Sequence, residues 1–336
     1  MELSRRPHAA ATAPARRPGV SVLVTTFNQD RFLAATLDSI RRQTVPPREV
    51  IVVDDGSTDS TAEILERVPD ITVVRQSNQG IAAARNAAVE RATGDLLAFI
   101  DGDDLWHPER LARLRQAYSL NPDVGLIVSE VECFEDCAGS EHVGSRSNLG
   151  GRFGAARGTW RGRCFEELLF EGNLFWTMSQ VAVPRSVVQE IGRSDSRFRI
   201  SSDYDLYLRI ARRYDVLVLQ EHLARWRQVS GSASGTGIRQ RIVNWRLDAA
   251  RVVKSHRDRL SEPERQEYSE AYRTHRDRLC RYVYDRSHLE SRASGAAELL
   301  RISLALRDTA ALAYAAGLCV PPSMAAAVGR RLGMGR

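Results

Sequence analysis

Residues 92–106 read ATGDLLAFIDGDDLW, a short apolar run that ends in three carboxylates. The segment from Leu96 to Ile100 has the length and composition of a buried strand. The side chains of Asp101, Asp103 and Asp104 repel one another there and resist burial, so the cluster is unfavourable unless a cation lies beside it. Ligands of open parallel sheets collect beyond the carboxyl ends of the strands. The stretch therefore predicts a site for a divalent metal and its phosphates, and a solvated acidic loop is the alternative.

The chain before this stretch alternates between strand-like and helix-like segments. Apolar, β-branched runs predict strands over residues 20–25, 49–53, 71–75 and 96–100, and helical periodicity predicts helices over residues 32–40, 62–67 and 81–92. Repeated strand, loop and helix units favour a doubly wound α/β fold with a mostly parallel sheet and right-handed crossovers. We therefore expect the loops after the strands to meet at one edge of the sheet.

Hydrogen-bonding side chains follow three of the predicted strands. These are Thr25 and Thr26, Asp54 and Asp55, and the acidic loop. Strand ends often carry Asp or Ser only to cap the next helix, and Ser57 and Asp59 can be read in that way. The three sets together indicate a ligand site.

Several segments, in this order, resemble the family 2 glycosyltransferases, which have a GT-A fold. They are VSVLVTTFN at 20–28, QT at 43–44, IVVDDGSTD at 51–59, NQG at 78–80 with ARN at 84–86, and FIDGDDLWHP at 99–108. The resemblance covers roughly residues 19–235. It implies transfer of a sugar from a nucleoside-diphosphate sugar to an acceptor hydroxyl, with inversion at the sugar carbon.

The resemblance also implies roles for the residues that bind the sugar donor. A divalent metal, Mg²⁺ or Mn²⁺, would lie on Asp103 with Asp101, and Asp101 and Gly102 would lie near the ribose. The base pocket would be lined by Thr25 and Phe27.

Two further donor contacts follow from the same resemblance. Asp55 would accept a hydrogen bond from a uracil-type imide, which favours a UDP sugar. Arg85 would meet the nucleotide or its diphosphate, although a helical Arg is more often simply solvated.

The resemblance continues over NLFWTMSQVAVPR at 173–185 and SDYDLYLR at 202–209, and it implies that Asp203 is the catalytic base. Without the resemblance, an Asp in a first helical turn would be read as a cap. Ser202 stands where the family commonly has Glu, and Val229 where many members have a His that contacts metal or diphosphate. His222 is out of register, so that contact is either missing or supplied by Arg225 or Arg227.

The remaining segments carry less specific signals. Residues 130–160 are rich in Gly, Ser and charge, which favours a variable loop over the site. Residues 1–18 predict a disordered tail and contain no secretory signal. Five cysteines without CxxC spacing favour reduced thiols over disulfides or a zinc site.

Residues 236–336 predict a helical, basic C-terminal region. They hold 19 basic and 11 acidic residues, a net charge of +8 within the chain's total of +6. Charges of both signs at helical spacing favour a solvated face over nucleic-acid binding. The region is expected either to lie on an anionic membrane surface or to pack on the catalytic domain or on a second subunit. No run of about 18 apolar residues is present, so we expect a cytoplasmic protein, soluble or peripheral on the membrane.

Together, these patterns predict an inverting glycosyltransferase of bacterial cell-surface polysaccharide, glycolipid or other glycoconjugate synthesis. The acceptor would be a saccharide or a lipid-linked saccharide. One alternative is a GT-A module that binds a nucleotide sugar without transferring it. The other is a nucleotidyltransferase or dinucleotide-dependent enzyme, against which no GxGxxG or P-loop motif follows any strand.

Overall fold

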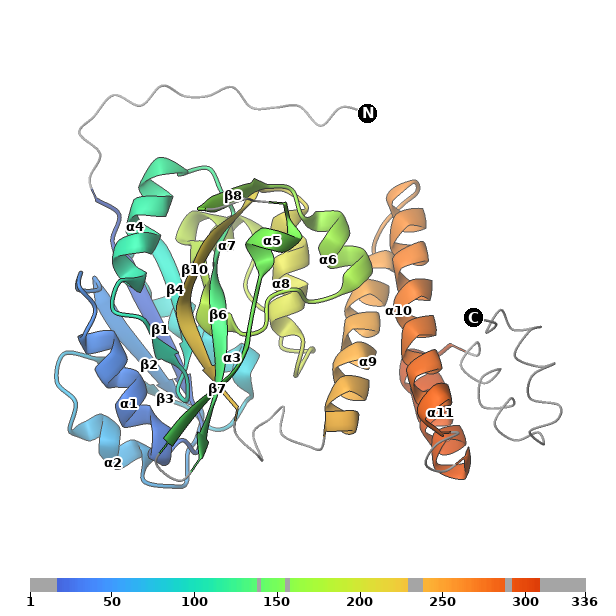
Figure 1. The fold of residues 1–336 in the computed structure, drawn as a ribbon, viewed down its shortest axis with the longest axis horizontal. Helices are drawn as coiled ribbons and strands as arrows, with labels where there is room; N and C mark the ends of the chain where they lie inside the picture. The colour runs from blue at the N-terminus through green and yellow to red at the C-terminus, as the bar shows by residue number, and fades with distance from the viewer. Residues whose placement is uncertain (1–16, 138–139, 155–157, 229–237, 288–291, 309–336) are drawn as a thin grey trace.

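A computed structural model describes residues 17–137, 140–154, 158–228, 238–287 and 292–308 (Figure 1). The predicted tail over 1–18 and the apolar segment after residue 309 therefore lie almost entirely outside the described residues. Within the described residues, no helix is long and apolar enough to cross a membrane.

The first half of the chain forms the parallel part of one sheet. Its strands lie in the order β3-β2-β1-β4, and all three pairings are parallel. They are β1 (Val20–Thr26), β2 (Glu49–Asp54), β3 (Thr72–Arg75) and β4 (Leu96–Asp101), and the helices between them are α1 (Asp30–Arg41), α2 (Thr61–Glu66) and α3 (Ile81–Arg91). The strands and helices predicted for residues 20–101 are all present, with ends that differ by at most two residues.

The second half makes the sheet mixed. Strand β9 (Val181–Pro184) pairs antiparallel with β4 and with β6 (Leu126–Cys137), whereas β6 pairs parallel with β10 (Val216–Arg227). Short β5 (Leu105–Trp106) and β8 (Thr159–Gly162) add antiparallel to β10. The α/β prediction is confirmed, but parallel pairing is confined to β3-β2-β1-β4 and to the β6–β10 pair.

The prediction of a loop over residues 130–160 is wrong. Most of it is regular structure, because β6 continues to Cys137, turns back as β7 (Ser140–Arg146), and is followed by α5 (Leu149–Arg152) and β8. Buried Glu130 explains why the charge was misleading. Its carboxylate accepts bonds from the Ser147 hydroxyl and the Gly150 N–H, so it is an internal structural group.

The remaining helices cover the sheet and form the C-terminal end of the described chain. They are α4 (Arg110–Leu120), α6 (Phe165–Glu171), the 3₁₀ turn η1 (Met178–Gln180), α7 (Arg185–Ile191), α8 (Ser202–Ala211), α9 (Ile238–Arg257), α10 (Glu264–Ser287) and α11 (Arg292–Leu306). In Figure 1, α9, α10 and α11 stand together beside α6 and α8.

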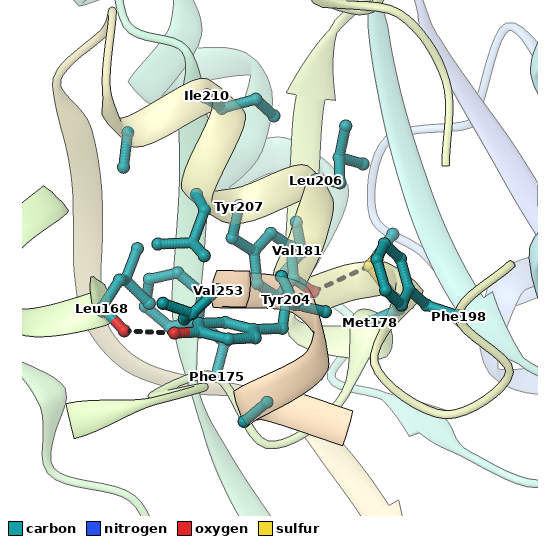
Figure 2. Packing of buried hydrophobic residues seen from close by; sticks show 14 of the residues in the cluster. Leu168, Phe175, Met178, Val181, Phe198, Tyr204, Leu206, Tyr207, Ile210 and Val253 are labelled. Atoms are coloured by element: carbon teal, nitrogen blue, oxygen red, sulfur yellow. Dashed lines mark hydrogen bonds between the residues drawn. The ribbon is translucent and has the colours of Figure 1, made fainter. Parts of the chain in front are cut away.

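The C-terminal helices share a hydrophobic core with one face of the sheet. Val253 of α9 lies beside Tyr204 of α8 in Figure 2, and residues of α10 and α11 belong to the same buried cluster. Cys133, Cys164 and Cys280 are buried free thiols, as the absence of paired spacing predicts. The region that the sequence predicts as helical thus contains α9, α10 and α11, and these helices pack on one face of the sheet.

Candidate active site

The carboxyl ends of β1, β2 and β4 bring the predicted polar side chains to one edge. Thr26 is in register with Asp54, and Thr25 with Asp101. The backbone continues this alignment, since the Gly102 N–H donates to the Thr25 carbonyl and the Asp55 N–H to the Thr26 carbonyl. The loops after three strands therefore meet where the sequence predicts.

Helix α1 holds the acidic loop in place. Its apolar face buries Leu33, Leu37 and Ile40, and Thr36 lies on the same face. The Thr36 hydroxyl bonds to the carbonyl oxygens of Gly102 and Asp104 at 2.9 and 2.8 Å. These two bonds explain why a polar residue, Thr36, lies on the apolar face of α1: it supports the acidic loop.

Asp104 is a structural acid. Its carboxylate accepts hydrogen bonds from the Thr177 hydroxyl, the Ser179 hydroxyl and the Arg227 backbone N–H at 3.1, 2.5 and 2.9 Å. Burial, and then the charges of Asp103 and Asp101, raise the pKa of Asp104 well above its usual range. These bonds connect the acidic loop to the turn before β9 and to the end of β10.

Asp101 is bound to Arg85 of α3. One Arg85 Nη donates to both Asp101 carboxylate oxygens at 2.9 and 3.2 Å, and the Thr25 hydroxyl donates to one of them at 3.2 Å. Arg85 is 7% exposed, and its Nε has no hydrogen-bond partner. Sequence reasoning left Arg85 open to a solvated position on its helix, whereas it is buried against the acidic loop.

Asp103 is the half-exposed acid of the loop. Burial, followed by the charge of Asp101, raises the pKa of Asp103 to about 6, and the Gln29 side chain hydrogen-bonds to it. Buried Oε1 of Gln29 and buried Oγ1 of Thr26 have no partner. A Cβ at Gly102 would lie 3.0 Å from Thr26 Oγ1 and would displace the Gln29 side-chain oxygen, so glycine permits this close approach.

These atoms fit a hard divalent cation. Mg²⁺ and Mn²⁺ prefer carboxylate and neutral oxygen ligands, and Mg²⁺ is commonly held by one or two carboxylates together with substrate phosphates. Asp103, Gln29 and Thr26 supply such oxygens, while Asp101 is engaged by Arg85. No group of three or more His, Cys, Asp or Glu side chains within the described ranges is arranged to hold a metal, so a cation here would depend on the phosphates.

The predicted base-pocket residues lie on the same edge. Phe27 is 44% exposed, which leaves its ring accessible to a flat partner. The Asp55 carboxylate accepts bonds from the Gln76 amide and from the backbone N–H groups of Gln79 and Gly80. A carboxylate has about four acceptor positions, so Asp55 can accept one more donor while it holds this loop.

Asp203 lies in the first turn of α8 and is half-buried. Its Oδ2 accepts a hydrogen bond from the Asn173 amide at 3.1 Å, and its Oδ1 accepts one from the Tyr204 N–H at 2.7 Å. Burial raises the pKa of Asp203, although the Arg85 guanidinium and these two donors oppose the shift. Arg85 is thus close to both Asp101 and Asp203.

Asp205 differs from Asp203 in burial and in ion pairing. It is 3% exposed and accepts bonds from Arg209 Nε and Nη2 at 3.0 and 2.8 Å. His256 Nε2 lies 2.9 Å from its other oxygen. The pairing with Arg209 has the i,i+4 spacing of one helix face, whereas sequence spacing carries no signal for the link to α9.

The positions that depart from the family pattern are placed in part. Val229 lies outside the described residues. Ser202 is fully buried and its hydroxyl has no partner, and His222 contacts the Ser147 carbonyl. Arg227 Nε donates to the Asp103 carbonyl at 2.8 Å, and Arg225 pairs with Glu132.

Sequence reasoning missed two side chains that touch the candidate acids. Gln29 reaches Asp103, and Asn173 reaches Asp203. Asn173 begins one of the segments that carry the family resemblance, and Gln29 directly follows another, so position alone marks them as candidates. Neither amide has a spacing pattern that would predict its contact.

Comparisons with known proteins agree with this geometry. The sequence pattern described as glycosyl transferase family 2 matches residues 21–167. An uncharacterized glycosyltransferase of Nostoc sp. is 36% identical over 113 residues, which cover 32% of this chain and 35% of that protein. The matches to the first three curated relatives cover only 35 to 40% of each relative's length.

Two solved structures have a similar fold over nearly the whole chain. Staphylococcus aureus TarS 1–349 in complex with UDP-GlcNAc has a TM-score of 0.57 at 17% identity and covers 94% of this chain and 89% of its own. The mannosyltransferase PcManGT from Pyrobaculum calidifontis, in complex with GDP-Man and Mn²⁺, has a TM-score of 0.53 at 19% identity, with coverages of 98% and 85%. At these identities the likeness establishes the GT-A fold alone. The family match covers residues 21–167, less than half of the chain, and together with the GT-A fold it supports a family 2 glycosyltransferase.

Proposed function

We propose that this protein transfers a sugar from a nucleoside-diphosphate sugar, with a UDP sugar favoured, to an acceptor hydroxyl. One observation carries the proposal: buried Arg85 brings the acids at the end of β4 and the acid at the start of α8 to one place. Transfer needs positive charge beside the leaving diphosphate, such as a cation held by a carboxylate, and it needs a base that meets the acceptor hydroxyl. Three acids here are half-exposed, and because Arg85 binds Asp101, Asp103 and Asp203 are the two available for these roles.

The donor would lie over the edge formed by β1, β2 and β4. The Phe27 ring would stack on the base, Thr25 would line the same pocket, and Asp55 would use its remaining acceptor position for an imide N–H. Asp101 and Gly102 would lie near the ribose. TarS binds UDP-GlcNAc and PcManGT binds GDP-Man, which supports a nucleotide-sugar donor of either kind.

Asp103 would hold a divalent cation, with Gln29 and Thr26 as neutral oxygen donors and Asp101 beside them. When bound, Mg²⁺ or Mn²⁺ stabilises the negative charge that develops on the leaving diphosphate. Arg85 contributes positive charge to the same region.

Asp203 would act as the general base. Its carboxylate removes the proton from the acceptor hydroxyl while the acceptor oxygen attacks the sugar carbon, and the bond from that carbon to the diphosphate breaks. A single displacement inverts the configuration at the sugar carbon. The raised pKa of Asp203 suits this role, because a more basic carboxylate accepts a proton more readily.

We assign the transferase activity to a domain over residues 19–235 and propose that residues 236–336 support it. The acceptor is proposed to be a saccharide or lipid-linked saccharide of bacterial surface glycoconjugate synthesis, met in the cytoplasm or at the membrane face. A homodimer through the C-terminal region is the competing use of that surface.

The experiment is to incubate the purified protein with a panel of UDP, GDP and dTDP sugars, with and without Mg²⁺ or Mn²⁺. Release of the nucleoside diphosphate with a saccharide acceptor supports the proposal. Donor binding without release under every condition would instead indicate a non-catalytic module. Release of pyrophosphate from a nucleoside triphosphate and a sugar phosphate would indicate a nucleotidyltransferase.

A further inference from the structure

The Asp203 carboxylate is held by a side chain outside its own helix. Its Oδ2 accepts a hydrogen bond from Asn173 Nδ2, while its Oδ1 is bound to the N–H of the next residue in α8. An amide donor on one oxygen limits rotation of the carboxylate. Free acceptor positions remain on both oxygens for an incoming hydroxyl.

The orientation of the Asn173 amide is fixed by its other end. Asn173 Oδ1 accepts a hydrogen bond from the Phe175 N–H at 3.1 Å. Since a backbone N–H can only donate, the oxygen must face Phe175, and the NH₂ group must therefore face Asp203. The side chain is thus a donor aimed at the carboxylate.

The position of Asn173 is set by the end of α6. That helix ends at Glu171, and Gly172 follows with φ of 100°, a conformation that favours glycine. Three side chains bind the last carbonyl oxygens of α6. The Tyr204 hydroxyl donates to Leu168 (Figure 2), His275 Nε2 to Leu169 and Arg278 Nη1 to Phe170, at 2.8, 2.7 and 2.7 Å.

Two of these three donors come from α10 in the C-terminal region. Helix ends leave four carbonyl groups without a partner, so donors at this point fix where the chain leaves the helix. His275 is 6% exposed and can only donate to a carbonyl, which identifies Nε2 as its protonated nitrogen. Asn173 follows Glu171, the last residue of α6, by two positions, so its place depends on how this helix end is held.

We propose that Asn173 is a positioning residue for the Asp203 carboxylate, and that His275 of α10 maintains this contact by holding the end of α6. The inference rests on the proposed role of Asp203 as the base. It gives the C-terminal helices a part in the transfer reaction that does not depend on membrane or subunit contacts.

The first test compares Asn173→Ala with Asn148→Ala. Asn148 is the matched control, because its Oδ1 also accepts a backbone N–H, from Gly151, and it caps the short helix α5. Misplacing a catalytic group by about 1 Å can cost on the order of 100-fold in rate. We expect Asn173→Ala to lower kcat about 10- to 100-fold at unchanged donor affinity by calorimetry, and Asn148→Ala to leave kcat unchanged.

The pH profile separates positioning from a general loss of structure. The charged groups that act on Asp203 are Arg85 from α3 and Asp101 from β4, with Tyr207 on its own helix. None of these groups is altered by Asn173→Ala. Loss of the amide donor disfavours the ionised carboxylate, so the acid limb of kcat/KM moves to higher pH. An unshifted limb with wild-type kcat overturns the proposal.

His275 is tested by a double-mutant cycle with Asn173. His275→Ala should lower kcat in the wild-type background and have little further effect in Asn173→Ala, whereas independent structural effects would add. His275→Gln, which offers an amide N–H, should restore part of the rate. If His275→Ala fails to fold, the His275→Gln and Asn173→Ala pair completes the cycle, and additive effects overturn the role of His275.

These outcomes are distinguishable from failure of the proposed function. If the wild-type protein transfers no sugar, or Asp203→Asn transfers at the full rate, the assignment of the base fails. If Asp203→Asn is inactive while Asn173→Ala and Asn148→Ala behave alike, only the positioning role fails.

Discussion

Asp203 and Asp205 lie two positions apart in α8, and replacing each by Asn should have opposite consequences. General-base assistance contributes 10²–10⁴ in rate, roughly 3–5 kcal/mol of barrier. Asp203→Asn should therefore slow transfer by that factor. Its affinity for the nucleotide sugar should remain, since the base meets the acceptor.

The same substitution should not destabilise the fold. Burial raises the pKa of Asp203 above its usual range, so the folded protein binds this proton more tightly than the unfolded chain does. The contribution of this group to stability is therefore present at low pH and is lost as the pH rises from about 4, the ordinary value for Asp, through the raised value. At pH 7 the neutral Asn removes an unfavourable buried charge but keeps only one of the two acceptor oxygens, so the two effects oppose each other and the melting temperature should change little.

Asp205→Asn should instead lower the free energy of unfolding. The carboxylate is buried, and Arg209 and His256 both bind it. Removing one partner of a buried ion pair costs about 3–5 kcal/mol, and the remaining amide oxygen favours the lower end. A loss of about 3 kcal/mol lowers the melting temperature by about 6–12 °C in a domain of this size. Catalysis should change little below the melting transition.

The assay combines nucleoside-diphosphate release, calorimetry with the donor, and thermal melting for each variant. Asp38→Asn is the control, because Asp38 pairs with Arg41 and Arg42 on the surface of α1, where such pairs contribute about 0–1 kcal/mol. The reasoning is refuted if Asp205→Asn abolishes transfer with an unchanged melting temperature while Asp203→Asn melts early and stays active.

Three further predictions concern the candidate site, and a fourth concerns the C-terminal region. Asp103→Asn should remove the metal-dependent part of donor binding, measured by calorimetry with and without EDTA, and full turnover of this variant in EDTA would contradict a metal at Asp103. Phe27→Ala should weaken donor binding by about 1–3 kcal/mol with no change in melting temperature, because an exposed ring contributes stacking more than packing; Phe27→Tyr should bind the donor like the wild type. The kcat/KM profile should rise with pH above the range of an ordinary Asp, near 4, because Asp203 must ionise to accept a proton, and a flat profile from pH 4 to 8 would exclude it as the base. Anionic liposomes should co-sediment with the protein at low salt and release it as salt rises, since residues 236–336 carry a net charge of +8 and each basic residue contributes about 1 kcal/mol within a Debye length of about 8 Å; absence of binding at low salt favours packing or dimerisation.

The parallel half of the fold could be predicted because its signals are local. Buried strands such as Leu96–Asp101 read as continuous apolar runs, and each ends where the polarity changes. Strand β9 could not be predicted as the antiparallel neighbour of β4, because that pairing joins residues more than 80 positions apart. The prediction for residues 130–160 failed for another reason: some polar side chains there, such as those of Glu130 and Ser147, are buried and bonded to each other, and composition does not distinguish an internal acid from an exposed one.

The candidate site could be predicted by residue type but not by role. Composition and spacing placed several acids at one sheet edge without distinguishing acids that hold the protein together from acids that remain for a substrate; only the family resemblance did so, for example by implying that Asp203 is the base. The structure makes this distinction by burial and by internal bonding. Asp54, Asp104 and Asp205 are buried and accept backbone or side-chain donors from segments that they hold in place. Asp55 is buried in the same way, and the proposed function uses only its remaining acceptor position.

Asp101, Asp103 and Asp203 are the acids of this edge that remain partly exposed. Asp101 is neutralised by Arg85, which leaves Asp103 and Asp203 without a bound cation of their own. Burial raises the pKa of both, so each would be stabilised by what a transfer reaction brings: a cation with the diphosphate at Asp103, and a proton from the acceptor at Asp203. Among the described residues, the two partly exposed acids of this edge that lack an ion pair are therefore the two that the proposed reaction would use.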